Sequence, residues 1–118
     1  MSPTIVYSPD GRVRLAVGAA GGATIIAQVA KAIIGVVDWK LGAQEALALP
    51  TVFAPAGETV YLERGTFLEA MAPELQALGH TKIDYRPPTT FKANAIEYVN
   101  DRWVGAADPR SEGAAVSE

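Results

Sequence analysis

The sequence predicts one α+β domain over residues 1–118, in which helices pack on a mostly antiparallel sheet. A chain of 118 residues is long enough to bury a sizeable hydrophobic core. Short alternating segments are separated by reversal signals, of which Asp10-Gly11 and Asn100-Asp101 are examples. The predicted order of elements is β-β-α-α-β-α-β-β-β, and this order favours helices layered against antiparallel strands.

The first half of the chain predicts a hairpin followed by two helices. The hairpin has strands at residues 4–7 and 12–17, with a turn at 8–11 between them. The two helices lie at 24–37 and 43–49. Residues 12–17 alternate charged and apolar side chains, as a half-buried strand does. The apolar run 24–37 is too long for a strand and predicts a core helix ending near Asp38 and Trp39. Pro50 closes the second helix.

The second half predicts shorter elements and a second hairpin. Strands are expected at 58–63 and 81–85, with a helix at 67–78 between them and loops at 51–57 and 86–90. The two hairpin strands are expected at 93–99 and 102–106. Thr66 and Glu69 form a predicted capping box for the helix, and Gly79 is its C-terminal cap. Pro73 predicts a break near 71–73, with Ala72 outside helical geometry. The tail 108–118 has the composition of a disordered segment.

Composition excludes several classes of function. The formal net charge of −3 gives no basic footprint for nucleic acid or for an anionic membrane surface. No targeting segment is visible in residues 1–10, and the apolar helix is too short to span a bilayer comfortably. Cysteine is absent, so disulfides and thiol chemistry are excluded. A hydrophobic fraction of 49% is high for a small domain, and a missing partner surface would explain it.

The turn between the strand 12–17 and the helix 24–37 is the candidate functional site. Gly21 and Gly22 lie there, where the first N–H groups of a helix have no intrahelical partner. Glycine lets a ligand approach such donors closely, so the turn is a candidate site for negative charge. The spacing from Gly18 is G-x-x-G-G, which matches no nucleotide-binding loop. A tight turn whose glycines serve packing alone is the alternative.

Other candidate chemical groups are few. His80 follows a helix-ending glycine and is expected to be a surface or capping residue. Ser2 and Thr4 lie near the amino terminus but in a strand, which disfavours a nucleophile there. Four acidic residues have no evident partner, and these are Asp38, Glu45, Asp84 and Asp108. No spacing predicts a metal site or a cofactor. The two tryptophans, Trp39 and Trp103, are expected to fill core or interface space.

Several segments, in order, resemble the carboxy-terminal part of the γ-glutamyltranspeptidase family. They are MSPTIV, VGAAGGATII, WKLGAQEALALP, GETVYLERG, LQALGH and VGAADPRSEGAAV. The most specific are residues 1–6, Gly21-Gly22 within G-x-x-G-G-x-x-I, and residues 105–110. The resemblance covers nearly the whole chain, which would be the carboxy-terminal part of the family's small subunit.

The resemblance implies an N-terminal nucleophile hydrolase fold, an αββα sandwich of two stacked sheets between helical layers. In the family, a precursor cuts itself and exposes a threonine that attacks the γ-glutamyl amide of glutathione. The acyl group then passes to water or to an amine. The family's glycine pair matches Gly21 and Gly22 and donates backbone N–H groups to the tetrahedral oxyanion. With this resemblance in view, the oxyanion role is preferred to the packing role.

The departures from the family pattern bear on activity. The family's catalytic threonine and its substrate-gripping residues, including a Ser-Ser pair, lie upstream of the methionine that matches Met1. The chain is therefore expected to supply the oxyanion-hole glycines but no nucleophile, and to be inactive alone. The end 111–118 also departs from the family's glycine-rich ending, so no catalytic role is assigned there.

Two functions follow as hypotheses. In the first, the chain is part of a γ-glutamyltransferase or hydrolase that acts on glutathione or another γ-glutamyl compound. In the second, it is a non-catalytic binding or assembly module that kept the fold. A sheet without its upstream strands would expose edges and an apolar face, so a homodimer or a nucleophile-bearing partner chain is expected. For the full-length protein, the resemblance suggests a periplasmic or secreted location.

Overall fold

The helices and strands follow the predicted order, with one short strand added. A computed structural model describes residues 1–116, so the end of the predicted tail, Ser117 and Glu118, lies outside the described residues. The elements are β1 Thr4–Tyr7, β2 Val13–Ala20, α1 Ile25–Val37, α2 Ala43–Ala48, β3 Val52–Phe53, β4 Thr59–Glu63, α3 Ala72–Ala77, β5 Lys82–Arg86, β6 Lys92–Val99 and β7 Arg102–Ala107. Short 3-10 turns lie at Gly22–Thr24, Phe67–Met71 and Pro88–Thr90.

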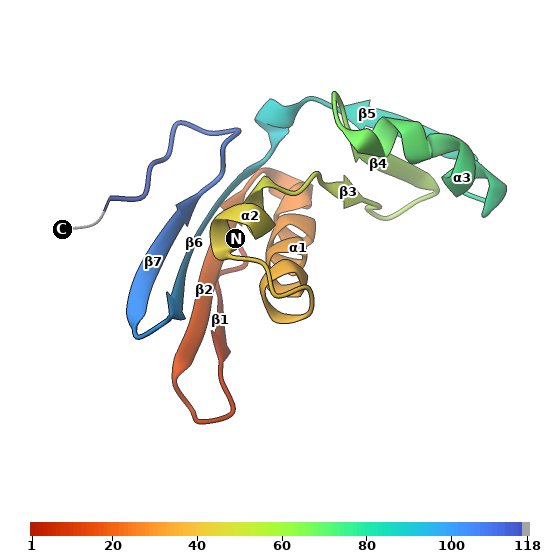
Figure 1. Cartoon of the computed structure of the whole chain (residues 1–118). Coiled ribbons are helices and arrows are strands. Elements are labelled where there is room, and N and C mark those ends of the chain that lie inside the picture. The colour runs from red at the N-terminus through yellow and green to blue at the C-terminus, as the bar shows by residue number, and fades with distance from the viewer. Residues whose placement is uncertain (117–118) are drawn as a thin grey trace.

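The strands form two sheets (Figure 1). The larger sheet has the order β1-β2-β6-β7 and is antiparallel throughout. The smaller sheet has the order β3-β4-β5, in which β3 pairs antiparallel and β5 pairs parallel with β4. The parallel pair needs a crossover, and α3 lies within that connection. This arrangement confirms the predicted α+β class with mostly antiparallel sheets.

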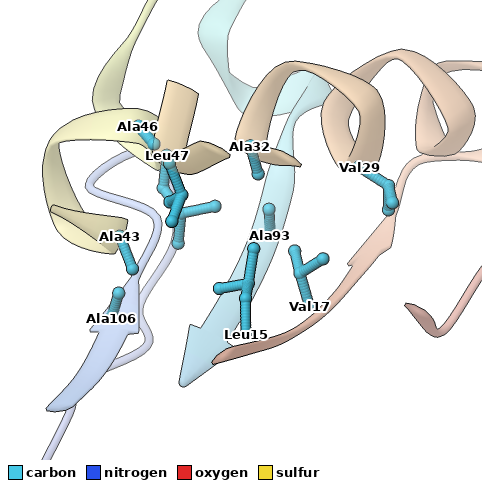
Figure 2. Packing of buried hydrophobic residues seen from close by; sticks show 10 residues of the cluster. Leu15, Val17, Val29, Ala32, Ala43, Ala46, Leu47, Ala93 and Ala106 are labelled. Carbon is cyan, nitrogen blue, oxygen red and sulfur yellow. The ribbon is translucent and has the colours of Figure 1, made fainter. Parts of the chain in front are cut away.

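One face of the larger sheet packs on α1 and α2. Figure 2 shows Leu15, Val17 and Ala93 of the sheet facing Val29 and Ala32 of α1, and all five are buried. The two helices are themselves in close contact: a β-carbon at Gly35 of α1 would lie 2.7 Å from the β-carbon of Ala46 on α2. A separate cluster fills the space between the smaller sheet and α3; its buried members are Val60, Leu62, Leu68 and Ala72.

The opposite face of the larger sheet carries no helix of the described chain, and the tail after β7 crosses its β6–β7 side, where a β-carbon at Gly105 would lie 3.0 Å from that of Ala115. Residues paired across the four strands form one row on this face, Ile5, Ala16, Ile96 and Gly105. Ile5 is 54% exposed and Ile96 is 40% exposed, and Trp103 is 53% exposed beside Tyr98. We call this surface, made of Ile5, Ala16, Ile96, Gly105 and Trp103, the free sheet face. Trp39 is exposed as well, so neither tryptophan fills the core.

Local differences from the predicted elements have simple causes. Strand β2 continues beyond Val17 to Ala20 because its last residues pair with β6, ending at Ala20 opposite Lys92. Helix α3 begins at Ala72, which has φ −54° and ψ −43°, so the prediction that Pro73 moves this residue out of helical geometry was wrong. Pro73 occupies the first turn of the helix, where its missing N–H is tolerated.

The capping of the 67–71 turn differs by one residue from the predicted capping box. Thr66 Oγ1 accepts the N–H of Leu68 at 3.3 Å, as an N-cap does. The carboxylate of Glu69 accepts the N–H of Gly65 at 2.7 Å, instead of that of Thr66. Gly79, at φ 102°, ends α3 as predicted, and His80 N–H donates to the carbonyl of Leu75 at 3.0 Å.

The start of the predicted disordered tail is instead the most buried ionic cluster in the described chain. The guanidinium of Arg110 contacts Glu63 at 2.6 Å and Asp108 at 2.9 Å, and its side chain is 8% exposed. It also donates to the carbonyls of residues 47, 48 and 49 at the end of α2, at 2.7 to 3.0 Å. We call Glu63, Asp108 and Arg110 the arginine cluster. Asp108, expected to lack a partner, is therefore paired.

Lys31 approaches the same helix end from α1. Its ammonium group donates to the carbonyls of Leu47 at 2.9 Å and Leu49 at 2.5 Å, and to Thr51 Oγ1 at 3.1 Å. Burial, together with the nearby positive charge of Arg110, lowers the pKa of Lys31 to about 8 from its ordinary 10.5. The C-terminal carbonyls of α2, which a short helix leaves without partners, are thus bound by two cations.

Replacing Arg110 by leucine should lower the free energy of unfolding by about 3 to 5 kcal/mol, because Glu63 and Asp108 would be left buried without their cation. Urea unfolding followed by circular dichroism measures the loss. The matched control is Arg12→Leu, which removes an arginine from an exposed pair with Asp10 and should cause no measurable change. Equal stability of the two variants would contradict the importance of the arginine cluster.

The lowered pKa of Lys31 predicts a pH dependence with a defined sign. Between its folded pKa of about 8 and the ordinary 10.5, the unfolded chain binds more protons, so stability rises as the pH rises. The unfolding free energy of the parent chain, minus that of Lys31→Met, should therefore increase from pH 8 to pH 10. Urea titrations of both proteins at each pH measure it. A flat difference would show that Lys31 keeps an ordinary pKa, and a falling one would show that its pKa is raised.

Candidate functional site

The glycine turn between β2 and α1 has the backbone geometry that only glycine adopts readily. Gly21 has φ 132° and Gly22 has φ 61°, both in the positive region. Gly22 opens the 3-10 turn that leads directly into α1. Both glycines are exposed. The sequence prediction placed them between a strand and a helix, and the structure has them there.

Hydrogen bonds from α1 hold this turn in place. Thr24 donates both its N–H, at 3.2 Å, and its hydroxyl, at 2.9 Å, to the carbonyl of Gly21. Gln28 is 1% exposed, and its amide nitrogen donates to the carbonyl of Ala20 at 2.9 Å and to Thr24 Oγ1 at 2.8 Å. The Gln28 oxygen accepts the N–H of Lys92 at 2.8 Å. One buried amide therefore ties the turn to the β2–β6 end of the sheet.

The N–H groups of the turn are not used by the fold. Within residues 1–116, neither Gly21 N–H nor Gly22 N–H has a hydrogen-bond partner, whereas the carbonyl of Gly21 has two. Exposed, unpaired donors at the start of a helix can bind an anion. The geometry meets the requirement of the predicted anion site. That these donors bind an oxyanion stays a prediction.

A small cavity of about 240 Å³ opens beside the turn. It is lined by Gly21, Ala23 and Thr90, and also by Phe53, Tyr61 and Arg86. Phe53, Tyr61 and Arg86 could not be predicted as site residues, because they come from three separate strands and form no motif. Only the strand pairing of the smaller sheet brings them together.

The other candidates from the sequence do not join the turn. His80 is exposed at the end of α3, as expected of a surface residue. Within residues 1–116 no group of histidine and acidic side chains could hold a metal ion. No helix among the described residues is long and apolar enough to cross a membrane. The glycine turn and its cavity are therefore the site on which functional arguments concentrate.

Comparison with known proteins gives the family. The family model described as Gamma-glutamyltranspeptidase matches residues 1–118. A glutathione hydrolase of Aspergillus flavus is 32% identical over 111 residues, which are 93% of this chain and 19% of the relative. The Acylase ACY 1 proenzyme of Pseudomonas sp. (strain SE83) is 33% identical over 118 residues, 99% of this chain and 20% of the relative.

Solved structures agree with the sequence comparison. The γ-glutamyltranspeptidase of Pseudomonas nitroreducens complexed with L-DON superposes with a TM-score of 0.86 at 27% identity, over 100% of this chain and 62% of that chain. The fold is thus that of an N-terminal nucleophile hydrolase, in the part that these structures share. The chain belongs to the γ-glutamyltranspeptidase family. It spans about a fifth of the length of the curated relatives that it matches.

The two glycines should respond differently to alanine. A β-carbon at Gly21 would lie 2.6 Å from the carbonyl oxygen of Thr90, whereas one at Gly22 would meet no atom within 4 Å. Gly22→Ala should cost about 1 kcal/mol of unfolding free energy, from its positive φ alone. Gly21→Ala should cost about 2 to 4 kcal/mol, because strain and overpacking add. Urea unfolding measures the loss of unfolding free energy in each variant. Equal losses would mean that the turn shifts enough to remove the contact between the new β-carbon at residue 21 and Thr90.

Proposed function

We propose that this chain supplies oxyanion donors for γ-glutamyl transfer to water or to an amine, while a nucleophile from outside residues 1–118 makes the attack. The observation that carries the proposal is the glycine turn, whose two exposed glycines have N–H groups without a hydrogen-bond partner within residues 1–116. The second support is that the chain belongs to the γ-glutamyltranspeptidase family. Glutathione or a related γ-glutamyl amide is the proposed substrate. Support comes from relatives whose names include glutathione hydrolase.

The proposed step is stabilisation of a tetrahedral intermediate. When a nucleophile attacks the γ-carbonyl carbon, the carbonyl oxygen gains negative charge, and the N–H groups of Gly21 and Gly22 would donate to it. The positive end of the helix dipole of α1 favours the same charge. Fixed donors need no reorganisation during the reaction, and each contributes about 2.7 to 4 kcal/mol of transition-state stabilisation. The Gln28 and Thr24 hydrogen bonds supply that rigidity.

The same proposal implies that the chain needs a partner for activity. The proposed oxyanion donors need a nucleophile that we do not assign within residues 1–116, since the hydroxyl of Thr24, which borders the cavity, is buried and bonded to Gly21 and Gln28. On the free sheet face, Ile5, Ile96 and Trp103 are exposed apolar side chains, which favours association with another chain. We propose that a nucleophile-bearing chain, or a second copy of this one, packs there. The relatives also include the Acylase ACY 1 proenzyme, so another acyl compound is the alternative substrate.

A non-catalytic binding or assembly module is the second candidate function. The free sheet face favours it, because an exposed apolar row across four strands is an association surface even when no reaction occurs. Under this function the glycine turn would serve packing alone. The experiment below separates the two candidates.

Two assays with a chromogenic γ-glutamyl anilide test the proposed function. The purified chain alone should show no turnover above that of its Gly22→Pro variant. A chimera that joins residues 1–118 to the preceding part of the Bacillus subtilis glutathione hydrolase proenzyme should be active, since that relative is 29% identical over 118 residues. In the chimera, Gly22→Pro removes one donor and, because proline cannot adopt the φ of 61° of Gly22, also changes the turn, so kcat should fall by at least about 10².

Gly22→Ala in the chimera is the matched control, because it keeps the N–H group and has space for its β-carbon. It should retain most of the activity that Gly22→Pro loses, and circular dichroism checks that both variants fold. Turnover by the chain alone would show that it holds a nucleophile. An active chimera that is insensitive to Gly22→Pro would overturn the oxyanion role, and an inactive folded chimera would favour the assembly module.

A further inference from the structure

The cavity beside the glycine turn is also lined by a stack of three side chains from neighbouring strands. Phe53 on β3 stacks on Tyr61 on β4, with ring centroids 4.9 Å apart and an interplanar angle of 17°. The guanidinium carbon of Arg86, on β5, lies 4.4 Å from the centroid of the Tyr61 ring. Because β4 is the central strand, Phe53 and Arg86 flank Tyr61. We call Phe53, Tyr61 and Arg86 the cation wall.

The cation wall is attached to the same framework as the glycine turn. Phe53 packs edge-on against Phe91, with centroids 6.4 Å apart, and Phe91 is fully buried. The next residue, Lys92, donates its N–H to Gln28, the side chain that also holds the turn. The wall and the turn are therefore positioned by one continuous set of contacts.

Arg86 differs from the arginines that stabilise the fold. Arg14 and Arg110 each bind a buried carboxylate, whereas Arg86 is exposed and, in the described part of the chain, has no carboxylate within ion-pairing distance. Stacking on an aromatic ring orients a guanidinium while leaving its N–H edge available. Such an edge binds a carboxylate through two parallel hydrogen bonds. The cation wall thus presents an unused carboxylate-binding group to the cavity.

We propose that the cation wall binds the carboxylate of a small amide or amine substrate whose reacting group lies at the glycine turn. The identity of this ligand rests on the function proposed above. The cavity volume of about 240 Å³ suits an amino acid or a dipeptide end, and it is below the range of drug-sized pockets. The carboxylate has two possible sources, the γ-glutamyl donor and the amine that leaves or accepts. Arg86 is then a specificity-determining residue.

Binding to the purified chain tests this proposal without turnover. The probes are glycylglycine for the amine and L-glutamine for the γ-amide donor, each compared with the corresponding C-terminal amide or α-amide. Nitrogen-15 NMR titrations should show saturable shifts at the N–H groups of Gly21 and Ala23 with at least one carboxylate probe. Whichever probe binds identifies the source of the carboxylate. The amide analogues should bind at least tenfold more weakly.

Arg86→Gln should weaken the same probe at least tenfold. Arg64→Gln is the matched control, because Arg64 also lies over a tyrosine of this sheet, 6.0 Å from the ring centroid of Tyr85, and does not border the cavity. The spectra of both variants check their fold. Equal binding to Arg86→Gln and the parent chain, equal binding of acids and amides, or no binding of either acid would overturn the proposal.

The two proposals can fail separately. Arg86-dependent binding of a carboxylate probe, together with an inactive folded chimera, would leave the cation wall as a ligand site and remove the catalytic function. An active chimera that depends on Gly22 N–H, with carboxylate binding unaffected by Arg86→Gln, would retain the catalytic function and remove the cation wall from it.

Discussion

The arginine cluster is the interaction on which the rest of the structure depends. Arg110 lies beyond the last strand of the larger sheet, Glu63 lies in the smaller sheet, and the carbonyls that Arg110 binds end α2. One guanidinium therefore connects both sheets and the helix between them. Buried charges are costly unless they are paired and hydrogen-bonded, and here every member has partners. The position of α3 and β5 relative to the glycine turn follows from this connection.

A second constraint connects the core to the candidate site. Gln28 lies on the buried side of α1, and its amide replaces backbone pairing at the end of the β2–β6 ladder. The turn can therefore keep two glycines at positive φ with their N–H groups free. Rigidity comes from side chains behind the turn, and the side facing the cavity stays open to a ligand. Such preorganisation is what anion stabilisation requires.

Much of the fold could be predicted from sequence because its local signals agree. Alternation, the Asp10-Gly11 turn and the Asn100-Asp101 turn, whose residues have φ 52° and 60°, placed the hairpins of the larger sheet. The site was predictable only at Gly21 and Gly22. The cation wall depends on pairing among β3, β4 and β5, which no local pattern encodes. The buried ion pairs of Arg110 were not predicted, because the composition of residues 108–118 describes their average character and says nothing of the contacts of one side chain.

The pairing of β2 with β6 has a consequence for how this chain reaches its folded state. Strand β2 lies near the start of the chain, and the partner that completes its hydrogen bonds is made only near the end. During synthesis on the ribosome, the β1–β2 hairpin and α1 emerge before β6, so the β6-facing edge of β2 is unpaired. The side-chain oxygen of Gln28 cannot yet accept the N–H of Lys92. Contacts so distant in sequence slow folding. The glycine turn therefore acquires its final shape only after Lys92, 64 residues beyond Gln28, has been made.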